Sequence, residues 1–225
     1  MSQLTVVCGA SGGLGPAVAT LLMGRGDQVI GVAAPREPRE QLELAVPNCN
    51  WEQADLTDRE QTEQLWERID GFGGRVRWLV NITGGYRASR ALETSEEDYR
   101  FLLRLNLDSC WWSCREGARR IAAGGGGGIV NISARQALEG GAGSAAYAVS
   151  KAAVLRLSQV LAAELKTDQV RVNVLLPTLI DTPANRAERS AEAMRNAVSP
   201  AAVAEVIGWL CSEESAAVTG ASLTV

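Results

Sequence analysis

The chain has 225 residues and a mass of 23.9 kDa, with 46% hydrophobic and 21% charged residues, which suits one domain with a core of its own. The 26 acidic residues outnumber the 22 basic ones, so the charge of −4 gives no electrostatic reason to expect nucleic acid or an anionic membrane as a partner. Histidine is absent from the sequence, which excludes His-ligated metal sites, Ser–His–Asp triads and histidine general bases.

Short β-rich runs alternate with longer helical patterns along the chain, and this alternation predicts βαβ units around a parallel sheet. We expect strands at residues 4–8, 28–33, 50–54, 77–82, 129–132, 170–175 and 221–225. We expect helices at residues 14–23, 58–70, 96–123, 146–165 and 200–211. Glycines 124–128 end the long helix, either as a flexible turn or as a phosphate loop. The fold class predicted is a single Rossmann-like, doubly wound α/β domain over residues 1–225, with a parallel seven-stranded sheet and helices on both faces.

A glycine-rich turn follows the first predicted strand directly and leads into the first predicted helix. It reads Gly9-Ala10-Ser11-Gly12-Gly13-Leu14-Gly15, with the spacing G-x-x-x-G-x-G. Glycines permit a tight turn and a close approach of backbone to a pyrophosphate, and the N–H groups at the start of a helix favour an anion. We therefore expect a dinucleotide site at Gly9, Ser11, Gly13, Leu14 and Gly15, the alternative being a turn that is merely tight.

A tyrosine and a lysine, Tyr147 and Lys151, stand four residues apart in the helix predicted from 146 to 165. This spacing puts them on one face of the helix. A phenol with a pKa near 10 is a poor acid at neutral pH, but a nearby cation lowers that pKa. The pair is therefore a candidate for proton transfer, the alternative being a surface tyrosine beside an unrelated lysine.

The glycine spacing at residues 9–15 and the Tyr147-x-x-x-Lys151 pair together resemble the short-chain dehydrogenase/reductase superfamily, over essentially the whole chain. The resemblance implies hydride transfer between a substrate and NAD or NADP, with Tyr147 as the proton donor or acceptor. It also implies that Lys151 binds the nicotinamide ribose and depresses the tyrosine pKa, and that Asn106 helps to hold a proton-relay water.

The same resemblance implies a set of cofactor contacts further along the chain. Asp55, followed by Leu56, matches the aspartate that bonds the adenine ring. Asn81 and Gly84 match a segment beside the cofactor at the end of the fourth strand. The cofactor contacts expected near the nicotinamide and the phosphates are Pro177, Ile180 and Thr182.

The chain departs from the family pattern at the catalytic serine, whose position is taken by Ala134. Ser133 lies one residue away, and adjacent residues of a strand point to opposite faces, so it can replace the serine only if the strand ends or bulges there. The family serine stabilises charge on the substrate oxygen. Ser133 is therefore kept as a catalytic candidate that depends on the local backbone.

A second departure lies at the end of the second strand, where an acidic residue would bind the ribose hydroxyl of NAD. The aligned residue is Ala33, and Arg36 follows shortly after it. An arginine can pair with a 2′-phosphate, although Arg36 can equally be a solvated loop residue. The sequence therefore favours NADP as the cofactor, with NAD as the alternative.

Local stretches around Ala134, Leu176-Pro177, 181–186 and Gly84-Gly85-Tyr86 are similar to the dihydropteridine reductase branch of the family, which also lacks the serine. That branch carries an acidic residue where this chain has Ala33, and it lacks the asparagine found here at 106. The residues expected to line the substrate pocket are Tyr86, Arg135, Gln136 and Leu179, with a short lid at 183–199. Tyr86 could stack on a flat ring or could simply pack.

Three functions remain open: reduction of a small ketone or 3-oxoacyl compound, reduction of a quinonoid pterin-like ring or a conjugated imine or quinone, and non-catalytic dinucleotide binding. The five cysteines fit neither a disulfide framework nor a metal site, and the N-terminus lacks a signal pattern, so we expect a cytoplasmic protein. No apolar stretch is long enough to span a membrane. The resemblance implies a homotetramer, or a homodimer, with a small-molecule substrate and no metal.

Overall fold

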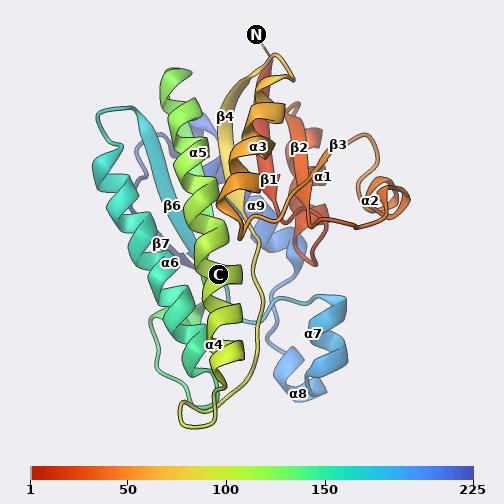
Figure 1. The fold of residues 1–225 in the computed structure, drawn as a ribbon, viewed down its shortest axis with the longest axis vertical. Helices are drawn as coiled ribbons and strands as arrows, with labels where there is room; N and C mark the ends of the chain where they lie inside the picture. The colour runs from red at the N-terminus through yellow and green to blue at the C-terminus, as the bar shows by residue number, and fades with distance from the viewer. Residues whose placement is uncertain (1) are drawn as a thin grey trace.

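The computed structural model describes residues 2–225 and has at its centre an all-parallel sheet with the strand order β3-β2-β1-β4-β5-β6-β7 (Figure 1). The strands are β1 (Gln3–Cys8), β2 (Gln28–Ala33), β3 (Asn50–Gln53), β4 (Arg75–Asn81), β5 (Gly127–Ile132), β6 (Val170–Leu176) and β7 (Ser222–Thr224). The strand order reverses between β1 and β4. In open α/β sheets a ligand binds beyond the carboxyl ends of the strands at such a reversal.

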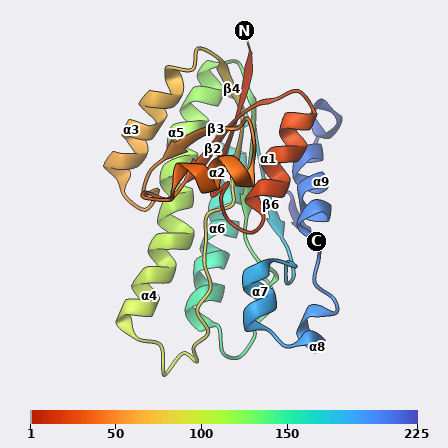
Figure 2. The same cartoon turned by 90° about the vertical axis from the view of Figure 1, so that its right-hand side faces the viewer.

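Helices cover both faces of the sheet, and Figure 2 shows α1 and α9 on one side and α3, α5 and α6 on the other. The helices are α1 (Gly15–Gly24), α2 (Arg39–Ala45), α3 (Arg59–Asp70), α4 (Glu96–Leu103), α5 (Ser109–Ala123), α6 (Ala145–Glu164), α7 (Pro183–Glu188), α8 (Ala191–Met194) and α9 (Pro200–Leu210). This arrangement confirms the predicted doubly wound fold with seven parallel strands.

Each face of the sheet has its own hydrophobic core. Val6 and Cys8 of β1 pack with Trp66 of α3 under the α3–α5–α6 layer, whereas Val7 packs with Leu22 under α1 and α9. Successive side chains of a strand point to opposite faces, and strands buried on both faces are apolar throughout. The apolar run of β1 is therefore explained by its central place in the sheet.

The long helix predicted at 96–123 is present as α4 and α5, but a π-helical turn at Arg104–Asp108 separates them. Such turns are rare and are frequent at functional sites. The short helices α2, α7 and α8 have no counterpart among the predicted elements. Glycines 124–126 form the turn into β5, with φ of +85° at Gly125 and +98° at Gly126, and Gly127 and Gly128 begin the strand. None of the five lines the cleft, so the phosphate-loop alternative does not hold.

All five cysteines are unpaired, and only Cys49 is partly exposed. Cys110 and Cys114 lie one turn apart on α5 with their sulfur atoms 3.8 Å apart and belong to the core under the α3–α5–α6 layer. In residues 2–225 no helix combines the length and the apolar character that crossing a membrane requires. The same residues contain no cluster of acidic or cysteine side chains that could hold a metal ion.

Candidate active site

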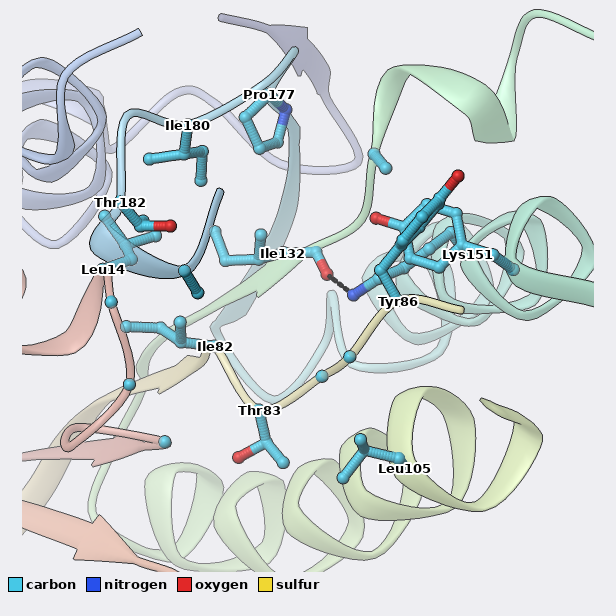
Figure 3. A pocket seen from close by; sticks show the side chains of 18 of the residues that line it. Leu14, Ile82, Thr83, Tyr86, Leu105, Ile132, Lys151, Pro177, Ile180 and Thr182 are labelled. Carbon is cyan, nitrogen blue, oxygen red and sulfur yellow. Dashed lines mark hydrogen bonds between the residues drawn. The ribbon is translucent and has the colours of Figure 1, made fainter. Parts of the chain in front are cut away.

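A cleft of about 950 Å³ lies across the carboxyl ends of the strands, between the glycine-rich turn after β1 and the lid formed by α7 and α8. Figure 3 shows Leu14, Ile82 and Thr182 on one side of it, and Tyr86 and Lys151 on the other. The predicted site residues that line the cleft are Gly9, Ser11, Gly13, Leu14, Asp55, Leu56, Gly84, Tyr86, Ser133, Arg135, Gln136, Tyr147, Lys151, Pro177, Leu179, Ile180 and Thr182. Residues spread over the whole sequence are thus brought into one site.

The turn after β1 is built from glycines because side chains would not fit there. Gly9 has φ +84°, and a Cβ on it would lie 2.8 Å from the backbone nitrogen of Thr83. A Cβ on Gly13 would lie 2.7 Å from Thr182 Cγ2, and one on Gly15 would meet the backbone of Ala10 at 2.3 Å. Among the described residues no side chain caps the N-terminus of α1. Gly15 N–H already donates to Gly12 O at 2.9 Å and Pro16 has no N–H, so within residues 2–225 the N–H groups of Leu14 and Ala17 are the ones at this helix start that remain available to a phosphate.

The end of the cleft beyond β2 and β3 carries two carboxylates, from Asp55 and Glu37. The Glu37 carboxylate accepts hydrogen bonds from Ser11 Oγ at 2.9 Å and from the Ala34 backbone at 3.1 Å. Arg36 has φ +72°, a left-handed conformation that turns the chain back at this point. The turn directs Glu37 toward the phosphate loop, while exposed Arg36 is not part of the cleft lining.

Lys151 is buried, with only 4% of its surface exposed, and its Nζ donates a hydrogen bond to the backbone oxygen of Ile132 at 3.0 Å (Figure 3). Burial lowers the pKa of this ammonium group to about 8. A Cβ on Gly84 would lie 2.9 Å from Lys151 Nζ and 2.7 Å from Asn106 Oδ1. The predicted residues Gly84, Asn106 and Lys151 are therefore immediate neighbours, and only glycine fits between the two side chains.

Tyr147 precedes Lys151 by one turn of α6 and meets Tyr86 edge to face, with 4.9 Å between ring centroids and 74° between ring planes. The guanidinium of Arg189 lies 4.5 Å from the centroid of the Tyr86 ring. Burial, followed by the neighbouring Tyr86, raises the pKa of Tyr147 to about 12, and the charge of Arg189 acts in the opposite direction. In this structure burial therefore outweighs the lowering of the tyrosine pKa that the Tyr147–Lys151 pair predicts.

Ser133 lines the cleft beside Ala134, but its hydroxyl is engaged within the protein. Its Oγ donates a hydrogen bond to the backbone oxygen of Lys151 at 2.7 Å, so its proton is already used within the protein. Ala134 follows in extended conformation, with φ −156° and ψ 157°, and no bulge brings the two residues to the same side. Adjacent residues in such backbone point to opposite sides. The structure therefore argues against Ser133 as a donor to the substrate oxygen.

Four predicted site residues do not line the cleft: Gly15, Arg36, Asn81 and Asn106. Asn81 is buried, and its amide donates to Asn131 Oδ1 at 2.8 Å, joining β4 to β5, while its own Oδ1 has no hydrogen-bond partner among residues 2–225. Asn106 lies in the π-helical turn and bonds both backbone groups of Gly85 as well as Ser150 Oγ at 2.9 Å. It therefore ties the loop after β4 to the helix that carries Lys151.

The sequence prediction missed several residues that the structure places in the cleft, above all Glu37 and Arg189. Glu37 follows the end of β2 by four residues, and a turn of the chain can bring a carboxylate at that spacing back to the strand end. This spacing could have indicated Glu37 as a cofactor-binding candidate. Arg189 lies within the lid predicted at 183–199, but no periodicity in that segment shows which residue faces the cleft. Thr83 and Leu105 also line the cleft, and each directly precedes a predicted site residue, Gly84 and Asn106 respectively (Figure 3).

These groups fit a dinucleotide cofactor. The glycines at 9 and 13 leave no room for side chains beside the phosphate loop, and hydroxyl and carboxylate groups lie at the adenosine end. At the other end a phenol and a buried ammonium group converge from one face of α6. A cleft with this polarity can hold a bound nicotinamide next to a proton-donating tyrosine.

Comparisons with known proteins agree with this geometry. A family model described as enoyl-(acyl carrier protein) reductase matches residues 9–225. The chain is 31% identical to carbonyl reductase family member 4 of Danio rerio, over all of this chain and 97% of that protein. It is 29% identical to 3-oxoacyl-(acyl-carrier-protein) reductase FabG of Escherichia coli K12, over 99% of this chain and 95% of that protein. A short-chain type dehydrogenase/reductase from Mycobacterium ulcerans superimposes with a TM-score of 0.92 at 28% identity, covering all of this chain and 90% of the other.

Proposed function

From the membership of this chain in the short-chain dehydrogenase/reductase superfamily, a family of NAD(P)-dependent oxidoreductases, we propose a specific reaction. The protein reduces the carbonyl group of a small ketone or 3-oxoacyl compound, and Tyr147 is the proton donor. The observation that carries the proposal is the placement of Tyr147 and buried Lys151 in one cleft with the phosphate loop.

The chemistry needs one hydride on the carbonyl carbon and one proton on its oxygen. The bound nicotinamide supplies the hydride. Tyr147, with a pKa of about 12, is protonated at neutral pH and can give its proton to the carbonyl oxygen as negative charge develops there. Lys151 keeps its charge below a pKa of about 8 and stabilises the tyrosinate that results. Asn106 holds the loop and the helix on which this pair depends.

Replacing Tyr147 by Phe tests the proposal, because the ring is kept and only the acidic hydroxyl is lost. We expect kcat/KM for reduction to fall by about 100- to 10,000-fold, the usual contribution of a positioned acid. Cofactor oxidation, followed optically with ketones and 3-oxoacyl thioesters, gives the rate. Cofactor binding, followed by fluorescence, should change little.

Tyr99→Phe is the matched control, since Tyr99 is exposed on α4 and lies outside the cleft. A Tyr147→Phe variant as fast as the Tyr99→Phe variant would overturn the catalytic role of Tyr147. A protein that binds the dinucleotide but oxidises it with none of these substrates would overturn carbonyl reduction.

We propose that NADH is preferred over NADPH, although the sequence favours NADP. The preference for NADP rests on the lack of a carboxylate at Ala33 and on Arg36 as a partner for a 2′-phosphate. The Glu37 carboxylate, bonded to Ser11 beside the phosphate loop, supplies a carboxylate from the following turn, whereas Arg36 is exposed and does not line the cleft. A carboxylate favours a ribose hydroxyl and repels a 2′-phosphate. We expect Glu37→Gln to strengthen the binding of NADPH relative to NADH, so that the ratio of the NADPH to the NADH dissociation constant falls by about tenfold. Glu40→Gln, on exposed α2, is the control. Tighter binding of NADPH by the unmodified protein would contradict the proposal.

A second substrate class, a conjugated or quinonoid ring, is favoured by one observation. The cleft has no serine hydroxyl at position 134, while the aromatic ring of Tyr86 lies beside Tyr147. A ring that spreads its charge over several atoms needs less help at one oxygen. Turnover of a quinonoid dihydropterin or an o-quinone, but of no ketone, would favour this class.

We also propose that the protein assembles as a dimer or a tetramer through α6 and the long helix made of α4 and α5, which runs beside it (Figure 1). Large apolar side chains are exposed on these helices: Tyr99, Phe101, Trp111, Val149 and Val160. Exposed apolar patches of this kind support self-association. Sedimentation velocity of the protein and of its Trp111→Glu variant tests the assembly, and a monomeric parent protein would exclude it.

The unpaired cysteines support a separate proposal, that the protein is located in the reducing cytoplasm.

A further inference from the structure

Arg189, at the end of α7, turns its side chain from the lid into the cleft. The residue leaves the helix in extended conformation, with φ −112° and ψ 152°, and it lines the cleft opposite the strand ends. Its guanidinium carbon lies 4.5 Å from the centroid of the Tyr86 ring. Its Nε atom is buried and has no hydrogen-bond partner among residues 2–225.

The other cationic groups near the cleft are already engaged. Arg135 pairs with Glu139 at 3.1 Å, and Lys151 donates to the backbone of Ile132. Arg186 on the same lid helix pairs with Asp181 through two bonds of 2.5 and 2.7 Å and does not line the cleft. Within the described part of the chain, Arg189 is thus the one arginine lining the cleft that has no ion-pair partner.

An unpaired guanidinium in a cleft is a costly arrangement for the protein alone. Buried polar N–H groups without acceptors lose the hydrogen bonds that they make in water. The flat fork of an arginine matches the two oxygens of a carboxylate, which accept parallel hydrogen bonds. A carboxylate on the substrate would satisfy the Nε of Arg189, which nothing in residues 2–225 does.

The position of Arg189 also indicates where that carboxylate lies on the substrate. Tyr86 contacts Arg189 through its face and meets Tyr147 edge to face. One aromatic ring thus connects the cation to the proton donor. A substrate with its ketone at Tyr147 and its anionic group at Arg189 must be short, with only a few bonds between the two groups.

We propose that Arg189 binds the free carboxylate of the substrate and that the preferred substrates are therefore small oxo acids. This inference rests on the proposed carbonyl reduction and narrows it to one substrate class. It separates this chain from an enzyme whose substrate presents a neutral thioester beside the ketone. The arginine acts in binding and selection, and Tyr147 remains the proton donor.

The test compares 3-oxobutanoate with its methyl ester, which has the same ketone and no charge. We expect the protein to favour the acid by at least about tenfold in kcat/KM, in line with a charge-assisted, two-bond contact. Arg189→Gln should lower kcat/KM for the acid by about 10- to 100-fold and change the value for the ester by less than about threefold. Arg189→Lys should recover only part of the loss, because an ammonium group lacks the fork.

Arg195→Gln is the matched control, because it removes the same charge from the exposed part of the same lid. It should leave the preference for the acid within about twofold. An ester that is reduced as well as the acid, or an Arg189→Gln variant that keeps the preference, would overturn the inference while carbonyl reduction stands.

A binding measurement keeps the inference testable if no substrate is turned over. Butanoate and butanamide differ only in charge and hydrogen-bond pattern, and calorimetry can compare their binding to the protein with oxidised cofactor. Tighter binding of butanoate, lost in Arg189→Gln, would support the anion site even if carbonyl reduction failed. Equal binding of the two compounds would overturn it.

Discussion

The two ends of the cleft are built from different materials. At the phosphate end, the groups that face the ligand belong to the backbone. Glycine is required at 9 and at 13 because a Cβ would collide with Thr83 in the first case and with Thr182 in the second. At the lid end, the groups are side chains, and Tyr86, Tyr147 and Arg189 are held against one another by ring and cation contacts. A backbone site is specified by where glycine must occur, whereas a side-chain site depends on how distant segments pack.

The two ends also differ in charge. Asp55 and Glu37 make the adenosine end acidic, whereas the lid end carries both signs: Arg189, which has no ion-pair partner among residues 2–225, and the neighbouring Glu188. Lys151 lies between the two ends, beside Gly84 and Asn106, where burial opposes its charge.

The largest effect is expected from the buried lysine. Its folded pKa of about 8 lies below the usual value of 10.5, so between these values the unfolded chain binds more protons than the folded one. The free energy of unfolding of the parent protein, measured relative to that of a Lys151→Met variant, should therefore rise by about 2 kcal/mol from pH 8 to 10. The cysteines whose pKa values are raised by burial lower the stability of both proteins over this range and cancel in the comparison. Urea denaturation at a series of pH values measures this difference.

Lys166→Met is the control for that series, because Lys166 is exposed just beyond α6. The series ends at pH 10 because of Tyr147, whose pKa in the folded protein is raised to about 12. Above pH 10 the tyrosine ionises in the unfolded chain but stays neutral in the folded one, so the free energy of unfolding falls with pH there. Parallel stability curves for the parent protein and Lys151→Met would show that Lys151 carries no burial penalty.

A methyl group at Gly13 should disturb both ends at once. The added Cβ would lie 2.7 Å from Thr182 Cγ2, and the Thr182 hydroxyl caps α7 by accepting from the Asn185 backbone at 3.2 Å. We expect Gly13→Ala to raise the dissociation constant of the cofactor by about tenfold, because overpacking by one carbon costs on the order of 1 to 3 kcal/mol. Fluorescence titration measures it.

Gly24→Ala serves as the comparison for Gly13→Ala, since no atom lies within 4 Å of a Cβ added at this helix end. Equal affinity of the two variants for the cofactor would mean that the phosphate loop and the lid move independently.

The fold could be predicted from the sequence because its signals are local. The apolar runs and the turns between them gave the strands to within a few residues, and buried strands such as Gln28–Ala33 are apolar by necessity. Helix α2 and the lid helices α7 and α8 were missed because they are short and bury little, with Leu42 the one buried residue among them. The π-helical turn around Asn106 was missed because its sequence continues a helical pattern.

The site was predictable where a residue type is demanded by the backbone or by a fixed helical spacing. Gly9, Gly13, Tyr147 and Lys151 fall in this group, and all four line the cleft. Glu37 and Arg189 could not be placed, because a left-handed turn at Arg36 and an extended helix end at Arg189 decide where their side chains point. Such backbone choices are settled by tertiary packing.

The smallest effect on activity is expected from restoring the family serine, which this chain lacks because Ala134 stands in its position. Ala134 is 4% exposed and lines the cleft, while neighbouring Ser133 points the other way, to the Lys151 backbone. A hydroxyl introduced by Ala134→Ser therefore points into the cleft, toward the site where the ketone oxygen gains charge. We expect kcat/KM for a neutral ketone to rise about threefold to tenfold, since a donor that has not been optimised supplies only part of the usual stabilisation. Ser133→Ala, which removes the internal bond, should show no such rise. If Ala134→Ser leaves ketone reduction unchanged, the reacting group does not concentrate charge on one oxygen, and the conjugated ring becomes the better account of the substrate.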